Sequence, residues 1–439
     1  MFGWRGQLLR VDLDNGSITK EPLSLDVARE YLGGRGLGAY LHGEEVPGSI
    51  APLSAENHLI FITGPLTGTL APNGGRYTVV TRTPPTGEVS AASISGKWGS
   101  ELKFAGFDGI IIEGKAAEPV YLWIKNGKAE LRSAAHLAGR TVSDTTEALI
   151  GETDARAVVA CIGPAGENEV NCSVIVSDYF SAAGGCGAGA VMGSKNLKAV
   201  VVCGTEGFRV ADRDKLLKSA NELRSHMKTR PIAAKGSLLH DSVLVADSMT
   251  WDPEPPELKH ARTRGCFSCA TCFSSFTYGD GKEYLPLLAG ATPFELGERM
   301  KEYRHFLDLG LDYAAAKSVL TSLGKEVEGS HTELARKMAD GQEFVSKENR
   351  SNGQNIDRGP CMVAGYAIVP KITAGNGQDE ALTILMSVLD SVSLCPFLAS
   401  GIGLEKIAEL LTHATGVPFT PDEMAQAGQR ISWVFRQTV

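Results

Sequence analysis

The chain lacks the features that mark membrane proteins and nucleic-acid-binding proteins. Its 439 residues contain no run of eighteen apolar residues, which excludes a membrane-spanning helix. The net charge is −8, and no basic stripe or arm interrupts the mixture of acidic and basic residues, which argues against a nucleic-acid partner. The opening residues, MFGWRGQLLRVDLDNG, have no basic segment before an apolar core. We therefore expect no signal peptide and a cytoplasmic location.

A disulfide framework is also missing. The chain has nine cysteines, an odd number, and they are unevenly placed. In the reducing compartment expected here, clustered cysteines more often bind metal or take part in chemistry. Glycine is in clear excess, with 50 residues, while proline and serine are not raised alongside it. This composition indicates tight turns and close approach of the backbone to a ligand rather than low complexity.

Strand-like and helical patterns divide the chain, whose length predicts two or three domains. Residues 1–205 contain strand-length runs separated by glycine and proline, and LLRVDLDNGSITKEPL predicts a hairpin around Asn15-Gly16. We expect one or two antiparallel sheets here, without an internal repeat. After Gly204 the period becomes helical, with Asp212 as an N-cap and GLEKIAELLTHATG as a late helix. The pattern predicts an α+β fold.

One short run, RGCFSCATCFSS, places Cys266, Cys269 and Cys272 at CxxCxxC spacing. This spacing can direct three sulfurs toward one point, and both zinc and an iron–sulfur cluster then require a fourth ligand. Cys395, which a proline follows, is the candidate. An iron–sulfur cluster is favoured, with zinc and plain burial as the alternatives. For the scattered cysteines we expect core packing: Cys161, Cys172, Cys186, Cys203 and Cys361.

Three glycine-rich stretches have the composition of backbone that approaches a ligand closely. They are YLGGRGLGAYL, GPLTGTLAPNGGRYTVV and SAAGGCGAGAVMGSKNLKA. Clustered backbone N–H groups suit phosphates, with Arg35, Arg76 and Lys195 as possible counter-charges. Tight turns in a β-rich domain explain the glycines equally well. A dinucleotide fingerprint is disfavoured, because no acidic residue follows the GxGxG run at the required distance.

Taken together, these stretches resemble one family. LGGRGLGAYL, LIFITGPLTGTLAPNGGRYTVVTRTPPTG, SELKFAGFDGIIIEGKAAEPVYLWI, IGPAGEN and GAVMGSKNLKAVVV are similar to the N-terminal domain of the aldehyde:ferredoxin oxidoreductases. Those enzymes carry tungsten on two pterin dithiolenes beside a [4Fe–4S] cluster. The resemblance implies a two-sheet, β-rich pterin-binding base in residues 1–205. It further implies a helical domain with the cysteine run and first pterin motif in 206–325, and a shortened helical domain with the second motif in 326–439.

The resemblance also assigns roles to individual residues. It implies that Cys266, Cys269, Cys272 and Cys395 bind the cluster and that Arg76 lies between cluster and pterin. Ser93 stands where an asparagine normally helps to hold a magnesium ion between the pterin phosphates, and Ala183 matches a cofactor-binding position. The pterin motifs supply the remaining contacts: Asp308, Gly310, Leu311 and Asp312 in the first, and Asp390 and Leu394 in the second. Carboxylates suit this role because they accept hydrogen bonds from pterin amine and ring N–H groups.

Two further matches concern chemistry and assembly. Glu283 matches a glutamate that transfers protons, so we expect it to act as general acid or base. Glu302 and His305 match the ligands of a metal that bridges two subunits in some members, and a solvated helix face is the alternative. A homodimer or a subunit of a complex is therefore expected.

The chain departs from the family pattern at several positions. It is shorter, Ser181 and Gly185 stand where arginines are usual, and Ser393 replaces a glycine of the second motif. Two functions follow. One is an enzyme that interconverts an aldehyde and a carboxylic acid at a tungsten or molybdenum bis-pterin centre and passes electrons singly through the cluster to ferredoxin or a partner subunit. The other is a member without the metallopterin, acting as an iron–sulfur electron-transfer or scaffold subunit. Retention of Arg76, AGEN, GSKNLK, Asp390 and Glu283 favours the first.

Overall fold

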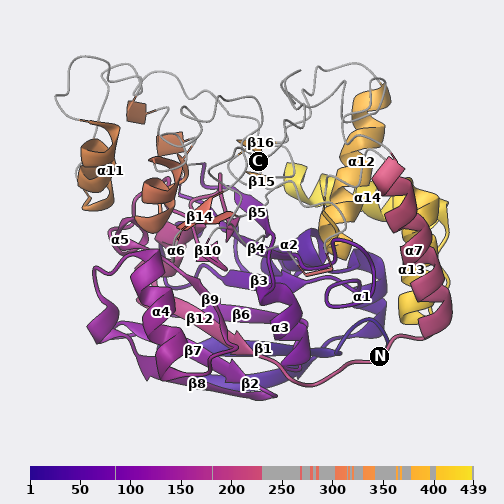
Figure 1. Ribbon diagram of the computed structural model, residues 1–439, viewed down its shortest axis with the longest axis horizontal. Coiled ribbons are helices and arrows are strands. Elements are labelled where there is room, and N and C mark those ends of the chain that lie inside the picture. Colours follow the sequence, from indigo (N-terminus) through magenta and orange to yellow (C-terminus); the bar gives the residue numbers. More distant parts are fainter. Residues whose placement is uncertain are drawn as a thin grey trace.

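The computed structural model describes most of the N-terminal half and separate later segments. The described residues are 1–84, 86–179, 181–229, 267–268, 277–279, 283–285, 302–313, 315–316, 319–320, 330–341, 362–363, 366–367, 377–395 and 402–437. The strands of the N-terminal half lie together in the lower part of Figure 1, and the long later helices flank and cover them. The α+β fold predicted from the sequence is confirmed.

The first sheet contains six strands in the order β2-β1-β6-β3-β4-β5. They are β1 (Gln7–Asp12), β2 (Ser17–Pro22), β3 (Leu59–Thr63), β4 (Tyr77–Arg82), β5 (Val89–Ile94) and β6 (Gly109–Glu113). The hairpin predicted around Asn15-Gly16 joins β1 to β2. Every neighbouring pair is antiparallel except β1 and β6, which run parallel.

The second sheet also has six strands, in the order β11-β10-β9-β12-β7-β8. They are β7 (Val120–Lys125), β8 (Lys128–Ser133), β9 (Val158–Cys161), β10 (Val176–Ser177), β11 (Ser181–Ala182) and β12 (Leu197–Cys203). Here β7 and β12 form the one parallel pair. The prediction of purely antiparallel sheets was therefore wrong, because β1–β6 and β7–β12 are joined across long crossovers that local patterns do not reveal.

The two sheets are repeats of one unit. Read from the outer hairpin inward, β2-β1-β6-β3-β4-β5 matches β8-β7-β12-β9-β10-β11 in order and in the direction of every pair. The helices fall at matching points, except that the second unit has one extra helix, α5, between β9 and β10. In the first unit they are α1 (Leu25–Tyr31), α2 (Gly34–Glu45) and α3 (Trp98–Phe104); in the second they are η1 (Ala135–Leu137), α4 (Val142–Glu152), α5 (Pro164–Glu167) and α6 (Ala188–Ser194). The expectation of no internal repeat was wrong, because the units share topology rather than obvious sequence identity.

The hydrophobic core lies between the sheets. Alternate residues of one strand face opposite sides, so Ile110 and Ile112 of β6 enter the inter-sheet core while Ile111 faces the other side. Trp98 of α3 packs against Tyr77 and donates its indole N–H to the Val200 carbonyl, 3.1 Å away, thereby joining the sheets. Because the outer faces of both sheets are covered as well, strand residues are buried on two sides.

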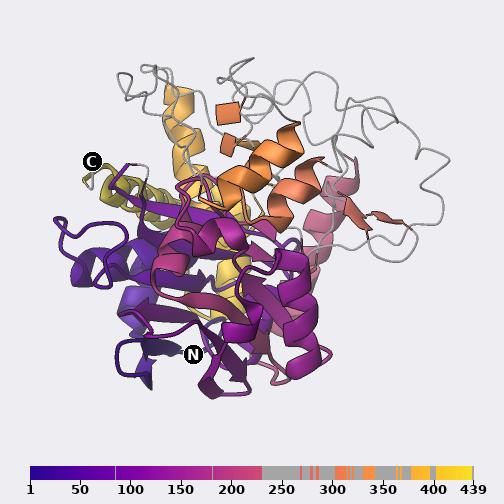
Figure 2. The same ribbon diagram turned by 90° about the vertical axis from the view of Figure 1, so that its left-hand side faces the viewer.

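The later part of the chain contributes helices and two short hairpins. They are α7 (Arg213–Thr229), α11 (His331–Ala339), α12 (Gly377–Val392), α13 (Leu404–Thr415) and α14 (Pro421–Gln437), together with the hairpins β13 (Thr277–Gly279)–β14 (Glu283–Leu285) and β15 (Met362–Val363)–β16 (Tyr366–Ala367). Asp212 accepts the Lys215 N–H at 3.0 Å, so the predicted N-cap is confirmed. Figure 2 shows α12 rising above the sheets. Within the described segments, no helix is long and apolar enough to cross a bilayer.

Candidate functional site

The two predicted pterin motifs pack at matching places on the two repeats. Gly64 follows β3, and a Cβ on it would lie 2.4 Å from the backbone carbonyl carbon of Val392. Gly163 follows β9, and a Cβ on it would lie 2.5 Å from the carbonyl carbon of Leu309. Only glycine allows such an approach, because real Cβ contacts are not this short. These glycines therefore bring each motif onto its half of the base, rather than opening space for a ligand directly.

The carboxylates of the first motif are used to hold the protein together. Asp308 accepts the Ser143 N–H at 2.9 Å and the Ser143 hydroxyl at 2.5 Å, in the first turn of α4. A carboxylate there satisfies an otherwise unpaired donor and interacts favourably with the helix dipole. Asp312 accepts the N–H groups of Gly185 and Ala315 at 2.8 and 3.0 Å. Both carboxylates therefore have protein partners already.

The second motif meets its helix in the same way, with a different residue. Ser391 accepts the Gly36 N–H at 3.0 Å in the first turn of α2, which is the counterpart of α4. Ser391 is thus the counterpart of Asp308. Counting one residue back, Asp390 corresponds to Leu307, an apolar residue that is 5% exposed. The two halves are therefore unequal, since only the second carries a carboxylate at this position.

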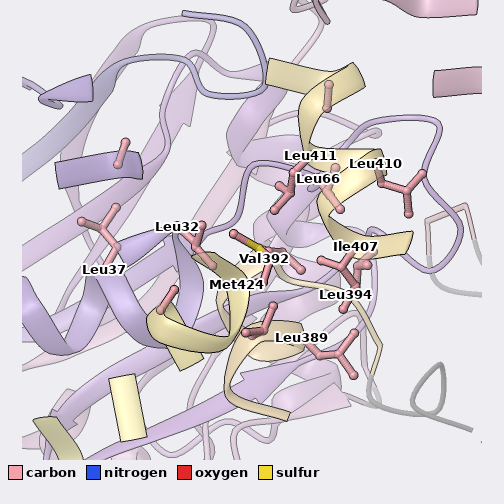
Figure 3. Close-up of a cluster of buried hydrophobic side chains, with 14 of the residues drawn as sticks. Leu32, Leu37, Leu66, Leu389, Val392, Leu394, Ile407, Leu410, Leu411 and Met424 are labelled. Carbon is pink, nitrogen blue, oxygen red and sulfur yellow. The ribbon is translucent and has the colours of Figure 1, made fainter. Parts of the chain in front are cut away.

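Further along, Ser393 corresponds to Gly310, and both have left-handed backbone, with φ of +60° and +77°. The Ser393 side chain is fully buried, and its hydroxyl has no hydrogen-bond partner among the described residues. Asp390 is 1% exposed, and the following Leu394 is fully buried. Figure 3 shows Leu394 and Val392 beside Leu66, which comes from the loop between β3 and β4. A buried, unsatisfied hydroxyl next to a buried carboxylate is suited to a polar ligand.

Arg76 lies at the other end of that loop and is 1% exposed. Its Nη1 donates to the Ser95 hydroxyl at 2.6 Å, and its Nη2 donates to the Ser93 carbonyl at 2.8 Å. Arginine stays protonated even when buried, so the guanidinium brings a fixed positive charge to this place. The Ser93 hydroxyl lies 3.4 Å from the Thr78 hydroxyl, and Ala183 donates its N–H to the Ile175 carbonyl at 2.8 Å, just before β10.

The other two cations suggested from the glycine stretches have structural contacts instead. The Arg35 guanidinium stacks 3.8 Å over the Phe435 ring. Lys195 donates to the carbonyls of Ala55 and Gly114 at 2.9 and 3.0 Å, and burial lowers the pKa of its ammonium to about 8. These contacts favour a structural role for Arg35 and Lys195 over the suggested role as counter-charges to a phosphate.

The cysteine run is described only at Phe267 and Ser268. Phe267 donates its N–H to the Gly96 carbonyl at 3.0 Å, and Asn73 donates its N–H to the Ser268 carbonyl at 2.8 Å. The dipeptide that separates two cysteines of the run therefore lies against the loop that ends at Arg76. Three of the predicted cluster ligands lie outside the described residues: Cys266, Cys269 and Cys272. In the part of the chain that is described, no group of three or more metal-binding side chains occurs.

Cys395, the fourth predicted ligand, is half-buried three residues after Val392. The core prediction for the scattered cysteines is confirmed for Cys161, Cys186 and Cys203, which are buried. Cys172 is half-buried, with its sulfur 3.8 Å from that of Met338, and burial raises the pKa of its thiol to about 12. Cys361 lies outside the described residues.

Of the three remaining predicted residues, the structure describes the side chains of Glu302 and His305. Glu283 opens β14, and its side chain lies outside the described residues. Glu302 accepts a hydrogen bond from the Tyr313 hydroxyl at 2.9 Å, and the His305 Nε2 lies 3.1 Å from the Thr332 carbonyl. These contacts favour a structural role for the Glu302–His305 pair.

Sequence reasoning missed the role of the AGEN stretch. Glu167 forms an ion pair with Lys198, which is 3% exposed, and accepts the Gly139 N–H at 2.7 Å. The Asn168 amide donates to the Ala339 carbonyl at 2.9 Å and so fixes the end of α11. The stretch is part of the scaffold that holds the first motif, and no spacing in the sequence indicates partners so far away.

Comparisons with known proteins place these features in context. Two family models match, "Aldehyde ferredoxin oxidoreductase, N-terminal domain" over residues 8–204 and "Aldehyde ferredoxin oxidoreductase, domains 2 & 3" over residues 357–437. A tungsten-containing aldehyde ferredoxin oxidoreductase from Pyrococcus abyssi is 48% identical over 532 aligned residues, covering 98% of this chain and 88% of that protein. The alignment is longer than the chain, so the relative has insertions with respect to it.

Two other proteins are similar in part or in fold. The WOR-like subunit of an aliphatic sulfonate oxidoreductase from Pyrococcus furiosus is 38% identical over 233 residues, which is 49% of this chain and 37% of that protein. The active site complex BamBC of benzoyl coenzyme A reductase, solved with 1,5-dienoyl-CoA, has a TM-score of 0.77 and 23% identity, covering 100% of this chain and 89% of that chain. The second likeness shows a shared fold.

Proposed function

Because the chain belongs to the aldehyde ferredoxin oxidoreductase family, we propose that it interconverts an aldehyde and a carboxylic acid at a tungsten- or molybdenum-pterin centre. One observation carries this assignment beyond the family. The loop between β3 and β4 contacts the second motif through Gly64 and Val392, and it contacts the cysteine run through Asn73 and Ser268. A pterin held by the motif and a cluster held by the run would then share this loop, at whose end Arg76 lies.

The residues present suit a pterin in the second half of the site. Asp390 is the carboxylate that would accept hydrogen bonds from pterin N–H groups, and the Ser393 hydroxyl would gain the partner it lacks among the described residues. The first half has Leu307 where the second has Asp390, so we propose that Gly310 and Leu311 contact the second pterin through backbone and packing. Bound metal and pterin supply oxygen transfer and the two-electron step.

The remaining assignments extend the proposal. Cys266, Cys269, Cys272 and Cys395 would hold a [4Fe–4S] cluster, which takes electrons singly to ferredoxin or a partner subunit. Ser93 would lie beside a magnesium ion at the pterin phosphates, and Ala183 would contact the cofactor. We place the protein in the cytoplasm, as a homodimer or a subunit of a complex.

Glu283 would exchange a proton with the substrate during turnover. The test is aldehyde-dependent reduction of a viologen dye under anaerobic conditions, with metal content measured in parallel. Glu283→Gln is expected to abolish turnover while iron and tungsten or molybdenum stay bound. Glu302→Gln is the matched control, because Glu302 is bonded to Tyr313, and it should retain turnover. Full turnover in Glu283→Gln would remove this residue from the mechanism.

A second function is favoured by one feature of the site. Leu307 and the absence of arginine at Ser181 and Gly185 remove polar groups from the first half. A chain that has lost the metallopterin and keeps the cluster as a subunit of a larger complex would show this pattern, and the likeness to a WOR-like subunit supports complex membership. Iron without tungsten or molybdenum in the purified protein would establish this second function.

A further inference from the structure

One arginine outside every predicted site joins three elements around the cysteine run. Arg224 lies on α7, and its Nη2 donates to the Leu70 carbonyl at 2.6 Å and to the Ser268 hydroxyl at 3.0 Å. Its Nη1 donates to the Asn221 side-chain oxygen at 3.0 Å, which fixes the guanidinium on its own helix. A single half-buried cation therefore connects α7, the loop between β3 and β4, and Ser268, one of the two residues that separate Cys266 from Cys269.

The backbone conformation at Ser268 supports a role for the hydrogen bond between its hydroxyl and Arg224. Ser268 has φ of +54°, a left-handed conformation that glycine adopts without strain and serine does not. Glycine would remove the strain but also the hydroxyl that Arg224 binds. Non-glycine residues persist in this region when their surroundings fix them, and such strain is concentrated at functional sites. A serine here is consistent with selection for the side-chain contact.

The dipeptide is also fixed from the side of Arg76. A Cβ on Gly75 would lie 2.9 Å from the Phe267 nitrogen, so glycine is required there for Phe267 to pack this closely. The Phe267 ring packs edge-to-face on Phe104, with centroids 5.8 Å apart. Two arginines consequently adjoin the dipeptide, Arg224 by a direct hydrogen bond and Arg76 through its neighbour Gly75.

We propose that Arg224 is a positioning residue for the iron–sulfur cluster, fixing the cysteine run through Ser268 and raising the cluster's reduction potential with its charge. This inference rests on the proposed function, since it requires the cluster. A positive charge near a cluster stabilises the reduced form, which carries one more negative charge. Half-burial of Arg224 limits the screening of that charge by solvent.

The test compares Arg224→Gln, Arg224→Lys and Ser268→Ala with the unmodified full-length chain, purified anaerobically. Arg213→Gln is the matched control, because Arg213 is an exposed arginine on the first turn of the same helix. Iron per chain is measured first, and the potential is then measured by a redox titration followed by electron paramagnetic resonance. Ser268→Ala keeps the cation and removes only the hydrogen bond, so it separates positioning from charge.

The expected results differ among the variants. Arg224→Gln should lower the ratio of reduced to oxidised cluster at a fixed potential roughly tenfold. This corresponds to a reduction potential lower by about 59 mV for a one-electron couple. Arg224→Lys should shift the potential less, Ser268→Ala should change the resonance signal or lower iron occupancy, and Arg213→Gln should match the unmodified chain. Loss of iron from Arg224→Gln, with the fold intact, also supports positioning.

An iron-loaded Arg224→Gln chain with unchanged potential and signal would overturn this inference and leave the proposed function standing. An unmodified chain without iron would overturn the cluster assignment and this inference with it.

Discussion

Replacing Asp308 of the first motif and replacing Asp390 of the second should have opposite consequences for stability and metal content. Asp308 caps α4 through two hydrogen bonds to Ser143, whereas Asp390 is buried beside Ser393 in the half-site that suits a pterin. Removing an N-terminal helix cap costs about 1–2 kcal/mol. For 439 residues, an unfolding entropy of about 2.1 cal/mol/K per residue amounts to about 0.9 kcal/mol/K, so loss of the cap lowers the melting temperature by roughly 1–2 °C. Asp308→Ala should therefore melt earlier and still bind tungsten or molybdenum.

Asp390→Ala should instead retain its iron and lose the heavy metal, because the carboxylate that would anchor the pterin is gone. The assay is a thermal melt of each variant in parallel with metals per chain by mass spectrometry. Ser391→Ala is the matched control, since Ser391 caps α2 as Asp308 caps α4. If Asp308→Ala loses tungsten or molybdenum as completely as Asp390→Ala while keeping its iron, the assignment of Asp308 to a helix cap is refuted.

Three further predictions concern stability. Lys103→Met should lower the free energy of unfolding by about 3–5 kcal/mol, because Lys103 lies 2.6 Å from Asp108 and both are buried. The variant leaves the Asp108 carboxylate buried without its cation, although the Arg5 and Gly6 N–H groups still donate to it; a denaturant midpoint like that of the unmodified chain would contradict this. Burial lowers the pKa of His42 to about 4 from 6.5, so the unfolded chain binds more protons between these values. Stability is then complete above pH 6.5 and falls as the pH drops toward 4, and His42→Gln should flatten that part of the curve; an unchanged slope would exclude His42. Ser393→Gly should raise the melting temperature of the metal-free chain by removing about 1–2 kcal/mol of left-handed strain, and a lower melting temperature would show that the Ser393 hydroxyl has a stabilising partner.

Local features of the fold follow from local sequence. The hairpin at Asn15-Gly16, the N-cap at Asp212 and the helix at Leu404–Thr415 all depend on residues within a few positions of one another. Turn chemistry, capping and a 3.6-residue period are sufficient to predict them. The pairing of β1 with β6 joins residues about a hundred positions apart, and no local pattern contains that information.

The candidate site shows the same division. Asp308 and Asp390 are both acids that stand a few residues before a leucine of their motif, Leu311 and Leu394, so their positions in the sequence are similar. Their difference depends on Ser143, which lies 165 residues before Asp308, and on Gly36 of α2, which lies 355 residues before Ser391. Gly64 lies in a stretch that was correctly taken as a point of close approach, but the approaching group is the backbone of the second motif rather than a ligand; the same role of Gly163 was not predicted. Identifying that group requires the tertiary structure.

The central claim is tested most directly by the metals that the protein contains. The chain is purified anaerobically, and iron, tungsten, molybdenum and zinc are measured by mass spectrometry. A tungsten- or molybdenum-pterin enzyme with one [4Fe–4S] cluster predicts about four irons and about one heavy metal per chain. Iron in that amount without tungsten or molybdenum would contradict the enzyme function and leave a cluster-bearing subunit. Zinc alone would contradict both the pterin and the cluster assignments.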